Sequence, residues 1–406
     1  MKEISIIAFL FIAAIGVVGL LLVVRDPAKL MEFGVEVPGS GSNLAALPNE
    51  LLMPSEEDSL SSPVAGGLTA FQPVVFEEPS AAGLQVLASI PYWAQARAFE
   101  SFKNNVEAID FVSLFWYYLT ADGKIAKYQY AKEEKQILDF AKARDVKVLA
   151  LVSNLPEGGG LDWDWKRVDG VIADPEKRKQ HIADIVALLE SKNFDGINID
   201  YENLQDEQTD NFSAFMKELG SALHEQGKIL KVALQRRENN DHTYGQDWIA
   251  VSQAADQLTF MTYDEHRQEG EPGPVASINW VRRTIEFALS LGVPKEKIVV
   301  GIPLYGYDWA MRKDGSFDTA KVLEYEDVAN IMKVFEARPQ FDEKSASPYL
   351  EYTVGKKHIV WFENEKSFAA KLELAKELGV GGIAFWRLGG EDPAVWEALG
   401  NAQQQN

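Results

Sequence analysis

The stretch FDGINIDYENL, residues 194–204, places Asn198, Asp200 and Glu202 at every second position, with isoleucines and a tyrosine between them. Side chains of a β-strand alternate between its two faces. A strand here therefore presents one amide and two carboxylates on one face, while Ile197, Ile199 and Tyr201 share the other. Buried acids are rare unless they are paired or functional, so this polar row is the first candidate site.

The surrounding chain alternates short apolar runs, rich in β-branched residues, with amphipathic helical patterns. Such runs are typical of parallel strands that are covered on both faces. Eight of them are expected as strands: 84–93, 109–120, 146–154, 195–204, 229–235, 257–266, 297–309 and 380–390. Eight strands with intervening helices predict an α/β fold, a (β/α)8 TIM barrel, with an open doubly wound sheet as the alternative. No glycine-rich phosphate-binding motif is present, which argues against nucleotide binding.

One segment breaks this rhythm. Residues 310–364 are too long for an ordinary loop and contain a helical pattern over 325–337 and strand-like pieces over 348–354 and 358–364. We expect a small α+β insertion after the seventh strand, forming a wall on one side of a cleft.

The N-terminal part differs in composition from the rest. Residues 4–24 form an uninterrupted apolar run, and about 20 such residues span a bilayer as a helix. We expect residues 1–30 to be a transmembrane signal anchor, with a cleaved signal peptide as the alternative. Residues 31–82, rich in Pro, Gly, Ser and acids, are expected to be a disordered linker, and residues 83–402 the barrel.

Composition excludes several classes of function. The net charge of −21 makes nucleic acid an unlikely partner, because phosphate binding needs clustered Lys and Arg. There are no cysteines, and the five histidines are scattered, which excludes thiolate chemistry and argues against a histidine metal site. We predict no cofactor and no metal, although carboxylates alone leave a cation site open.

The polar row is suited to acid–base chemistry. Glu202 lies nearest the C-terminal end of its strand, where barrel enzymes place their active sites. Burial and the neighbouring charge of Asp200 should raise the pKa of Glu202, so that it remains protonated and acts as a general acid. We expect Asp200 to stay ionised, with the amide of Asn198 as its hydrogen-bond donor. The alternative is that these groups only satisfy one another inside the barrel.

At this point the sequence resembles glycoside hydrolase family 18, the chitinase-like barrels, over about residues 84–400. Residues 194–204 resemble the family motif of the fourth strand. Three more segments resemble the family motifs of the sixth, seventh and eighth strands: MTYDEH (261–266), GIPLYGYDW (301–309) and GGIAFWRLGGED (381–392). The likeness is closest to the branch of spore-germination and cortex-lytic N-acetylglucosaminidases.

The resemblance implies roles for individual residues. Glu202 matches the acid/base, Asp200 the residue that orients the substrate's 2-acetamido group, and Tyr263 the tyrosine that hydrogen-bonds the acetamido oxygen. Trp386 matches the aromatic floor beneath the sugar whose bond is cleaved. The family implies a retaining, substrate-assisted mechanism, in which the protein supplies no nucleophile.

Further residues are expected to bind substrate. By resemblance, Met261 and Asp264 match pocket-lining positions, and Asn198 stands where many chitinases carry Asp. Aromatic side chains near strand ends are either sugar platforms or core residues. They are Trp93, Trp116, Tyr117, Tyr305, Tyr307 and Trp309.

Three functions remain open from the sequence. The first is a membrane-anchored, extracytoplasmic β-N-acetylglucosaminidase acting on peptidoglycan. The second is the same chemistry on chitin or chitooligosaccharides. The third is a non-catalytic glycan-binding barrel, which the retention of Glu202 disfavours.

Overall fold

A computed structural model of the chain describes residues 83–132, 135–158 and 162–404. The predicted membrane span and linker lie outside these residues. Within the described ranges, no helix is both long and apolar enough to cross a membrane.

Eight parallel strands form a closed barrel, as the sequence predicts. In the order in which they pair, the strands are β1 (Gln85–Pro91), β2 (Phe111–Leu119), β4 (Lys147–Ser153), β5 (Gly196–Asp200), β6 (Ile229–Gln235), β7 (Gln257–Met261), β8 (Ile298–Pro303) and β14 (Gly382–Trp386). The barrel closes because β1 pairs with both β2 and β14. A short strand, β3 (Ile125–Lys127), adds to β2 in the antiparallel sense.

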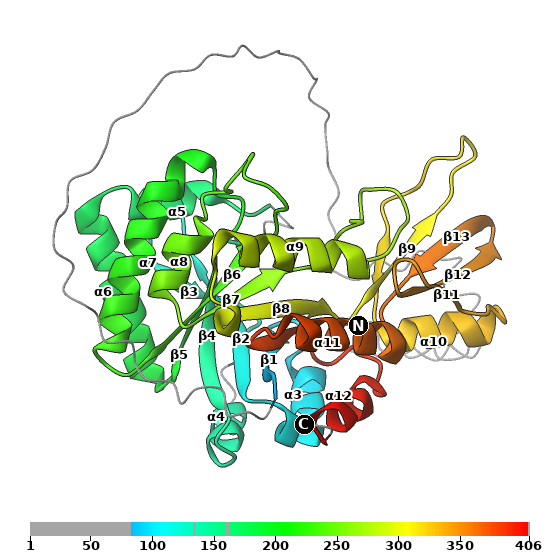
Figure 1. Ribbon diagram of the computed structural model, residues 1–406, viewed down its shortest axis with the longest axis horizontal. Helices are drawn as coiled ribbons and strands as arrows, with labels where there is room; N and C mark the ends of the chain where they lie inside the picture. The colour runs from blue at the N-terminus through cyan, green and yellow to red at the C-terminus, as the bar shows by residue number, and fades with distance from the viewer. Residues whose placement is uncertain (1–82, 133–134, 159–161, 405–406) are drawn as a thin grey trace, which may run out of the picture. The chain divides into compact units, whose positions relative to one another are not determined.

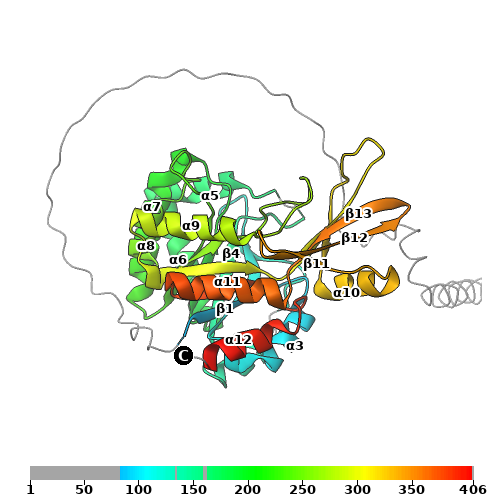
Figure 2. The same cartoon turned by 45° about the vertical axis from the view of Figure 1, so that its right-hand side comes forward.

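Helices cover the outside of the barrel (Figures 1 and 2). They are α3 (Gln95–Asn104), α4 (Lys135–Lys142), α5 (Trp165–Ile172), α6 (Pro175–Lys192), α7 (Thr209–His224), α8 (Trp248–Ala254), α9 (Ile278–Leu291), α11 (Glu365–Leu378) and α12 (Val395–Gln404), with 3-10 turns at Val106–Ala108, Asp206–Gln208 and Lys295–Lys297. Several begin at an acidic cap. The carboxylates of Asp174 and Asp247, for example, each accept hydrogen bonds from two backbone N–H groups of the first turn.

Two of the apolar clusters belong to the barrel and together position the polar row. Apolar side chains between strands and helices form the main cluster. A second, smaller layer fills the inside of the barrel and comprises Leu87, Phe111, Leu149, Val299 and Ala384. Because this inner layer plugs the barrel, polar side chains further along the same strands can open only toward the carboxyl ends of the strands.

The insertion forms its own antiparallel sheet in the order β10-β9-β13-β12-β11. Its elements are β9 (Gly306–Ala310), β10 (Lys321–Leu323), α10 (Tyr325–Val334), β11 (Gln340–Asp342), β12 (Ser347–Val354) and β13 (Lys356–Trp361). The single strand predicted over residues 297–309 is wrong, because the chain divides into β8 and β9. Glycine is required at 306, since a Cβ there would lie 2.6 Å from the backbone oxygen of Trp361.

Candidate active site

Asn198, Asp200 and Glu202 line one cleft of about 830 Å³. Strand β5 ends at Asp200, and Glu202 follows two residues later. The predicted inward-facing row is therefore confirmed. Met261, Tyr263, Asp264 and Trp386 line the same cleft. Four motifs that are far apart in the sequence thus contribute to one surface.

The expected hydrogen bond between Asn198 and Asp200 is wrong. The Nδ2 group of Asn198 donates instead to Ser113 Oγ on β2, at 3.2 Å. One oxygen of Asp200 is buried without a hydrogen-bond partner. Alternate residues of a strand stand about 6.6 Å apart, too far for a direct bond. Asp200 is therefore not fixed as an anion, and its burial raises its pKa to about 7.

Glu202 has the perturbed ionisation that an acid catalyst needs. Burial raises its pKa well above the ordinary value, and the charges of Asp200 and Asp264 raise it further. Arg267 acts in the opposite direction. The predicted rise of the Glu202 pKa is confirmed. A carboxyl group that keeps its proton near neutral pH can donate it to a leaving group.

The backbone of Glu202 is held by Asn154, which follows β4. Its Oδ1 accepts from the N–H of Glu202, and its Nδ2 donates to the carbonyl of Glu202, both at 2.8 Å. The next residue, Asn203, has a φ of 59° and donates its N–H to Gln235 Oε1. Sequence analysis missed Asn154. The available signal was a buried-strand pattern, VLALVSN, that ends on an amide at the carboxyl end of a barrel strand.

Tyr263 brings a phenol next to the acids. Burial raises its pKa well above the ordinary value, and the charges of Asp200, Glu202 and Asp264 add to the effect. The hydroxyl consequently stays protonated and can serve as a hydrogen-bond donor. Gly301 on β8 makes room for this ring, since a Cβ there would lie 3.0 Å from Tyr263 Cε1.

Asp264 has a left-handed backbone, with φ at 61°, and its carboxylate accepts from two tyrosines. Tyr305 Oη donates to its Oδ1, and Tyr307 Oη donates to the same oxygen at 2.7 Å. Tyr307 lines the cleft but Tyr305 does not. The expectation that Tyr305 contacts sugar is wrong, because Tyr305 is buried in the turn between β8 and β9, where its hydroxyl donates to Asp264.

The predicted aromatic platforms differ in position. Trp386 lines the cleft and packs edge-on against Phe115 and Trp93, with ring centroids 5.8 and 6.2 Å away. Trp93 is 47% exposed but borders a neighbouring hollow beside Tyr130. Trp116 is fully buried, so its assignment to the cleft is wrong.

The position of Trp116 follows from the phase of β2. Ser113 on this strand bonds Asn198, and Phe111 belongs to the inner layer. The odd-numbered positions thus face inward at the start of the strand, and Trp116 turns toward the helices. Tyr117 and Trp309 are also buried among core residues.

Several further residues complete the lining of the cleft. Two arginines, Arg236 and Arg267, and three aromatics, Trp163, Tyr244 and Trp280, line it. Arg236 forms an ion pair with Glu238 and lies over the ring of Trp280. Most of them lie on loops whose direction strand periodicity does not predict.

Comparison with known proteins identifies the family. The sequence matches Glycosyl hydrolases family 18 over residues 91–391. The chain belongs to this family. It is 32% identical over 268 residues to the uncharacterised glycosylase YvbX of Bacillus subtilis, covering 64% of this chain and 76% of YvbX. The cortical fragment-lytic enzyme of the same organism is 27% identical, covering 64% of this chain and 61% of that enzyme.

The fold is shared with solved family structures. A chitinase from Chromobacterium violaceum superimposes with a TM-score of 0.72 at 31% identity, covering 80% of this chain and 100% of the chitinase. This family 18 member is a glycosidase acting on N-acetylglucosamine-containing glycans. The non-catalytic alternative is thereby set aside.

Proposed function

We propose that the protein cleaves β-linked N-acetylglucosamine glycans of peptidoglycan by a retaining, substrate-assisted mechanism. The observation that carries the proposal is the shared cleft of Glu202, Asp200 and Tyr263. Glu202 has a raised pKa, and Tyr263 is a protonated phenol. Glu202 is thus a proton donor, Asp200 is a group that can become an anion, and Tyr263 is a neutral hydrogen-bond donor.

In the first step, Glu202 gives its proton to the glycosidic oxygen, and the C1–O bond breaks. The substrate's acetamido oxygen attacks C1 and forms a cyclic oxazolinium ion, so no protein nucleophile is needed. Positive charge then develops beside Asp200, which lowers the pKa of Asp200 and favours its anion. Tyr263 donates a hydrogen bond to the acetamido oxygen and orients it.

In the second step, the Glu202 carboxylate takes a proton from water, and the water oxygen attacks C1 from the face that the leaving group vacated. The ring opens, the acetamido group is restored and Glu202 regains its proton. The anomeric configuration is retained because C1 is inverted twice.

Peptidoglycan is favoured over chitin by two observations. One relative is named a cortical fragment-lytic enzyme. The other is Arg267, a cationic side chain that lines the cleft and is exposed. Muramic acid and its peptides carry carboxylates, whereas chitin carries none. The likeness to a chitinase supports the second candidate, hydrolysis of chitooligosaccharides.

We also propose that the barrel acts outside the cytoplasm, held at the membrane by residues 4–24. The support is the apolar run itself and the location of a polymeric wall substrate. Protease treatment of intact cells, compared with lysed cells, tests it. Protection of the barrel in intact cells would contradict it.

The decisive experiment offers purified muropeptide strands and chitooligosaccharides to the barrel domain, with Glu202→Gln in parallel. Product masses identify the bond, and early NMR spectra of the products identify the anomer. We expect a β-anomer with an N-acetylglucosamine reducing end, and a loss of at least about 100-fold in Glu202→Gln. An α-anomer would overturn the mechanism. Activity on chitooligosaccharides alone would overturn the substrate, and an unaffected Glu202→Gln would overturn the site.

A further inference from the structure

We propose that Tyr244 is a platform for the sugar on the leaving-group side of the scissile bond, and that Asp206 is the positioning residue that holds it there. This inference rests on the proposed glycosidase function and extends the same cleft. Neither residue belongs to the motifs that the sequence shares with the family.

Tyr244 is an unusual residue in two respects. It is 39% exposed and is one of the few large apolar side chains that face solvent in the described part of the chain. It also lines the catalytic cleft. Its φ of 51° is left-handed, a conformation that non-glycine residues adopt only when the surroundings hold them in it. An exposed ring that is held in a strained backbone conformation indicates a binding function.

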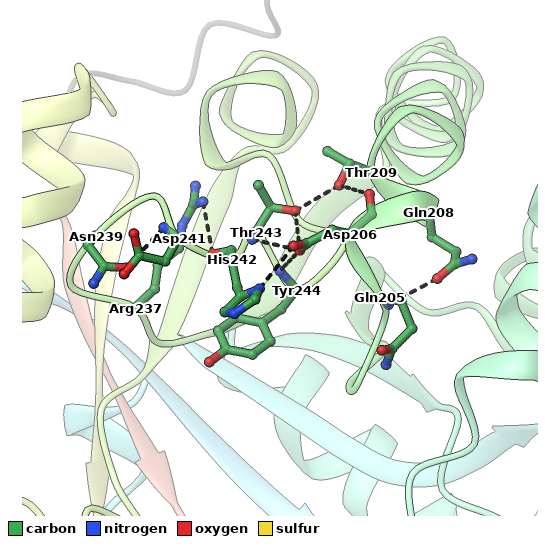
Figure 3. A network of polar contacts seen from close by, with 10 residues as sticks. All are labelled: Gln205, Asp206, Gln208, Thr209, Arg237, Asn239, Asp241, His242, Thr243 and Tyr244. Carbon is green, nitrogen blue, oxygen red and sulfur yellow. Dashed lines mark hydrogen bonds and ion pairs between the residues drawn. The ribbon is translucent and has the colours of Figure 1, made fainter. Parts of the chain in front are cut away.

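The carboxylate of Asp206 provides the restraint (Figure 3). It accepts from the backbone N–H groups of Thr243 and Tyr244, at 2.8 and 3.1 Å, and from the Thr243 hydroxyl at 2.9 Å. The ring of His242 lies against the other oxygen, with Nδ1 at 3.1 Å. Three consecutive residues of the loop after β6 are therefore fixed by one side chain of the loop after β5.

Contacts around this carboxylate join the same two loops more firmly. The Thr209 and Thr243 hydroxyls lie 2.8 Å apart. Gln246 donates to the carbonyl of Tyr201 and accepts from the N–H of Gln235. At Gly245 a Cβ would lie 2.5 Å from the Leu204 Cβ. The loop that presents Tyr244 is thus held in place against the segment that carries Glu202, which lies two residues before Leu204.

The order of the strands around the barrel places Tyr244 on the leaving-group side of the scissile bond. Around the closed barrel, β5 stands four strands from β14 in either direction, and β6 stands four from β1. Trp386 ends β14, and Trp93 follows β1. Tyr244 follows β6, on the side of Glu202. A glycan crossing the mouth of the barrel meets Trp386 on one side and Tyr244 on the other. Since Trp386 is assigned to the sugar that is attacked, Tyr244 takes the sugar that leaves.

The test compares two substrates in Tyr244→Ala, Tyr244→Phe and Val322→Ala. Val322 is a similarly exposed apolar residue on the second sheet and serves as the control. The substrates are a hexameric glycan and a disaccharide oxazoline, which has no leaving sugar. We expect Tyr244→Ala to lower kcat/KM about tenfold on the hexamer, through KM, and under twofold on the oxazoline. Tyr244→Phe should retain activity. Equal losses on both substrates would overturn the platform.

Binding separates this proposal from the proposed function. In a Glu202→Gln background, titration calorimetry with the hexamer should show about a tenfold weaker Kd after Tyr244→Ala. An unchanged Kd overturns the platform even if hydrolysis is confirmed. Conversely, a weaker Kd supports it even if the wild type proves to cleave neither substrate.

The role of Asp206 needs a readout that general destabilisation would not give. We expect Asp206→Ala to reproduce the substrate pattern of Tyr244→Ala, with no further loss in the double variant, because both remove the same contact. Asp206→Asn keeps an acceptor oxygen and should fall between Asp206→Ala and wild type. Additive losses, or equal losses on both substrates in a variant whose circular dichroism matches the wild type, would overturn the positioning role.

Discussion

Asn154 and Glu202, which follow neighbouring barrel strands, form a two-point contact in which the Asn154 side-chain amide both accepts from and donates to the backbone of Glu202. Both hydrogen bonds measure 2.8 Å, and Asn154 is fully buried. The amide fills the position at which β4 and β5 have ceased to pair. The direction of the Glu202 side chain thus depends on a residue that does not line the cleft.

Replacing Asn154 should impair catalysis more than substrate binding. We expect Asn154→Ala to lower kcat by up to about 30-fold with little change in KM, because two hydrogen bonds of about 1 kcal/mol each are lost. Asn154→Asp keeps the acceptor for the Glu202 N–H but sets a carboxylate oxygen against the Glu202 carbonyl oxygen, so it should not recover the lost activity. Steady-state kinetics on the hexamer measures both. An increase in KM with kcat unchanged would contradict this assignment.

Adding a carboxyl group at position 198, two residues before Asp200, should shift the pH dependence of kcat/KM. In Asn198→Asp, the additional charge raises the pKa of both Asp200 and Glu202, because like charges disfavour ionisation. Both limbs of the kcat/KM profile then shift to higher pH, the alkaline limb reporting the loss of the Glu202 proton.

The matched control for that profile is Ser113→Ala. It removes the hydrogen-bond partner of Asn198 without adding charge. Its profile should keep the wild-type limbs. If Asn198→Asp also leaves both limbs in place, the electrostatic coupling of the row is refuted.

Lys231 should make stability depend on pH. Its side chain is buried near the N-terminal end of β6. The Nζ atom lies 3.2 Å from the centroid of the Phe111 ring and donates a hydrogen bond to Gln257 Oε1. Burial lowers its pKa to about 7, against the opposing charges of Asp110 and Asp256. Between about pH 7 and 10 the unfolded chain binds a proton that the folded chain does not, so the free energy of unfolding rises with pH.

Lys231→Met should remove this slope, which amounts to at most about 1.4 kcal/mol per pH unit. Urea unfolding at pH 7, 8 and 9 measures it. Lys147→Met, at an exposed lysine, is the control and should keep the wild-type slope. A slope that persists in Lys231→Met would show that another group is responsible.

Replacing only one partner of the buried Lys371–Glu363 pair should strongly lower the free energy of unfolding. Lys371 Nζ lies 2.8 Å from Glu363 Oε2, both side chains are almost inaccessible, and the pair joins α11 to the end of the insertion. Lys371→Met leaves an uncompensated carboxyl group and should cost about 3–5 kcal/mol of stability. The double variant Glu363→Leu/Lys371→Met should recover most of it. Additive losses in urea unfolding would refute the coupling.

Much of the barrel was predictable because its signals are local. Strand period, run length and intervening helical patterns predicted a segment that contains each of the eight barrel strands, and the alternation in residues 194–204 placed Asn198, Asp200 and Glu202 on one face. Trp116 was misassigned because the phase of β2 has to be known before a side chain can be assigned to a face. Tyr305 was misassigned because the break between β8 and β9 carries no clear signal.

What the sequence alone determined was the set of chemical groups and the strand on which each stands, since these follow from residue type and a period of two. Only the tertiary structure decided their partners. Asn198 bonds Ser113, 85 positions away, rather than Asp200, and Glu202 is oriented by Asn154, 48 positions away. Hydrogen-bond partners and burial depend on the register between strands and the path of the loops, and these form only when distant segments pack together.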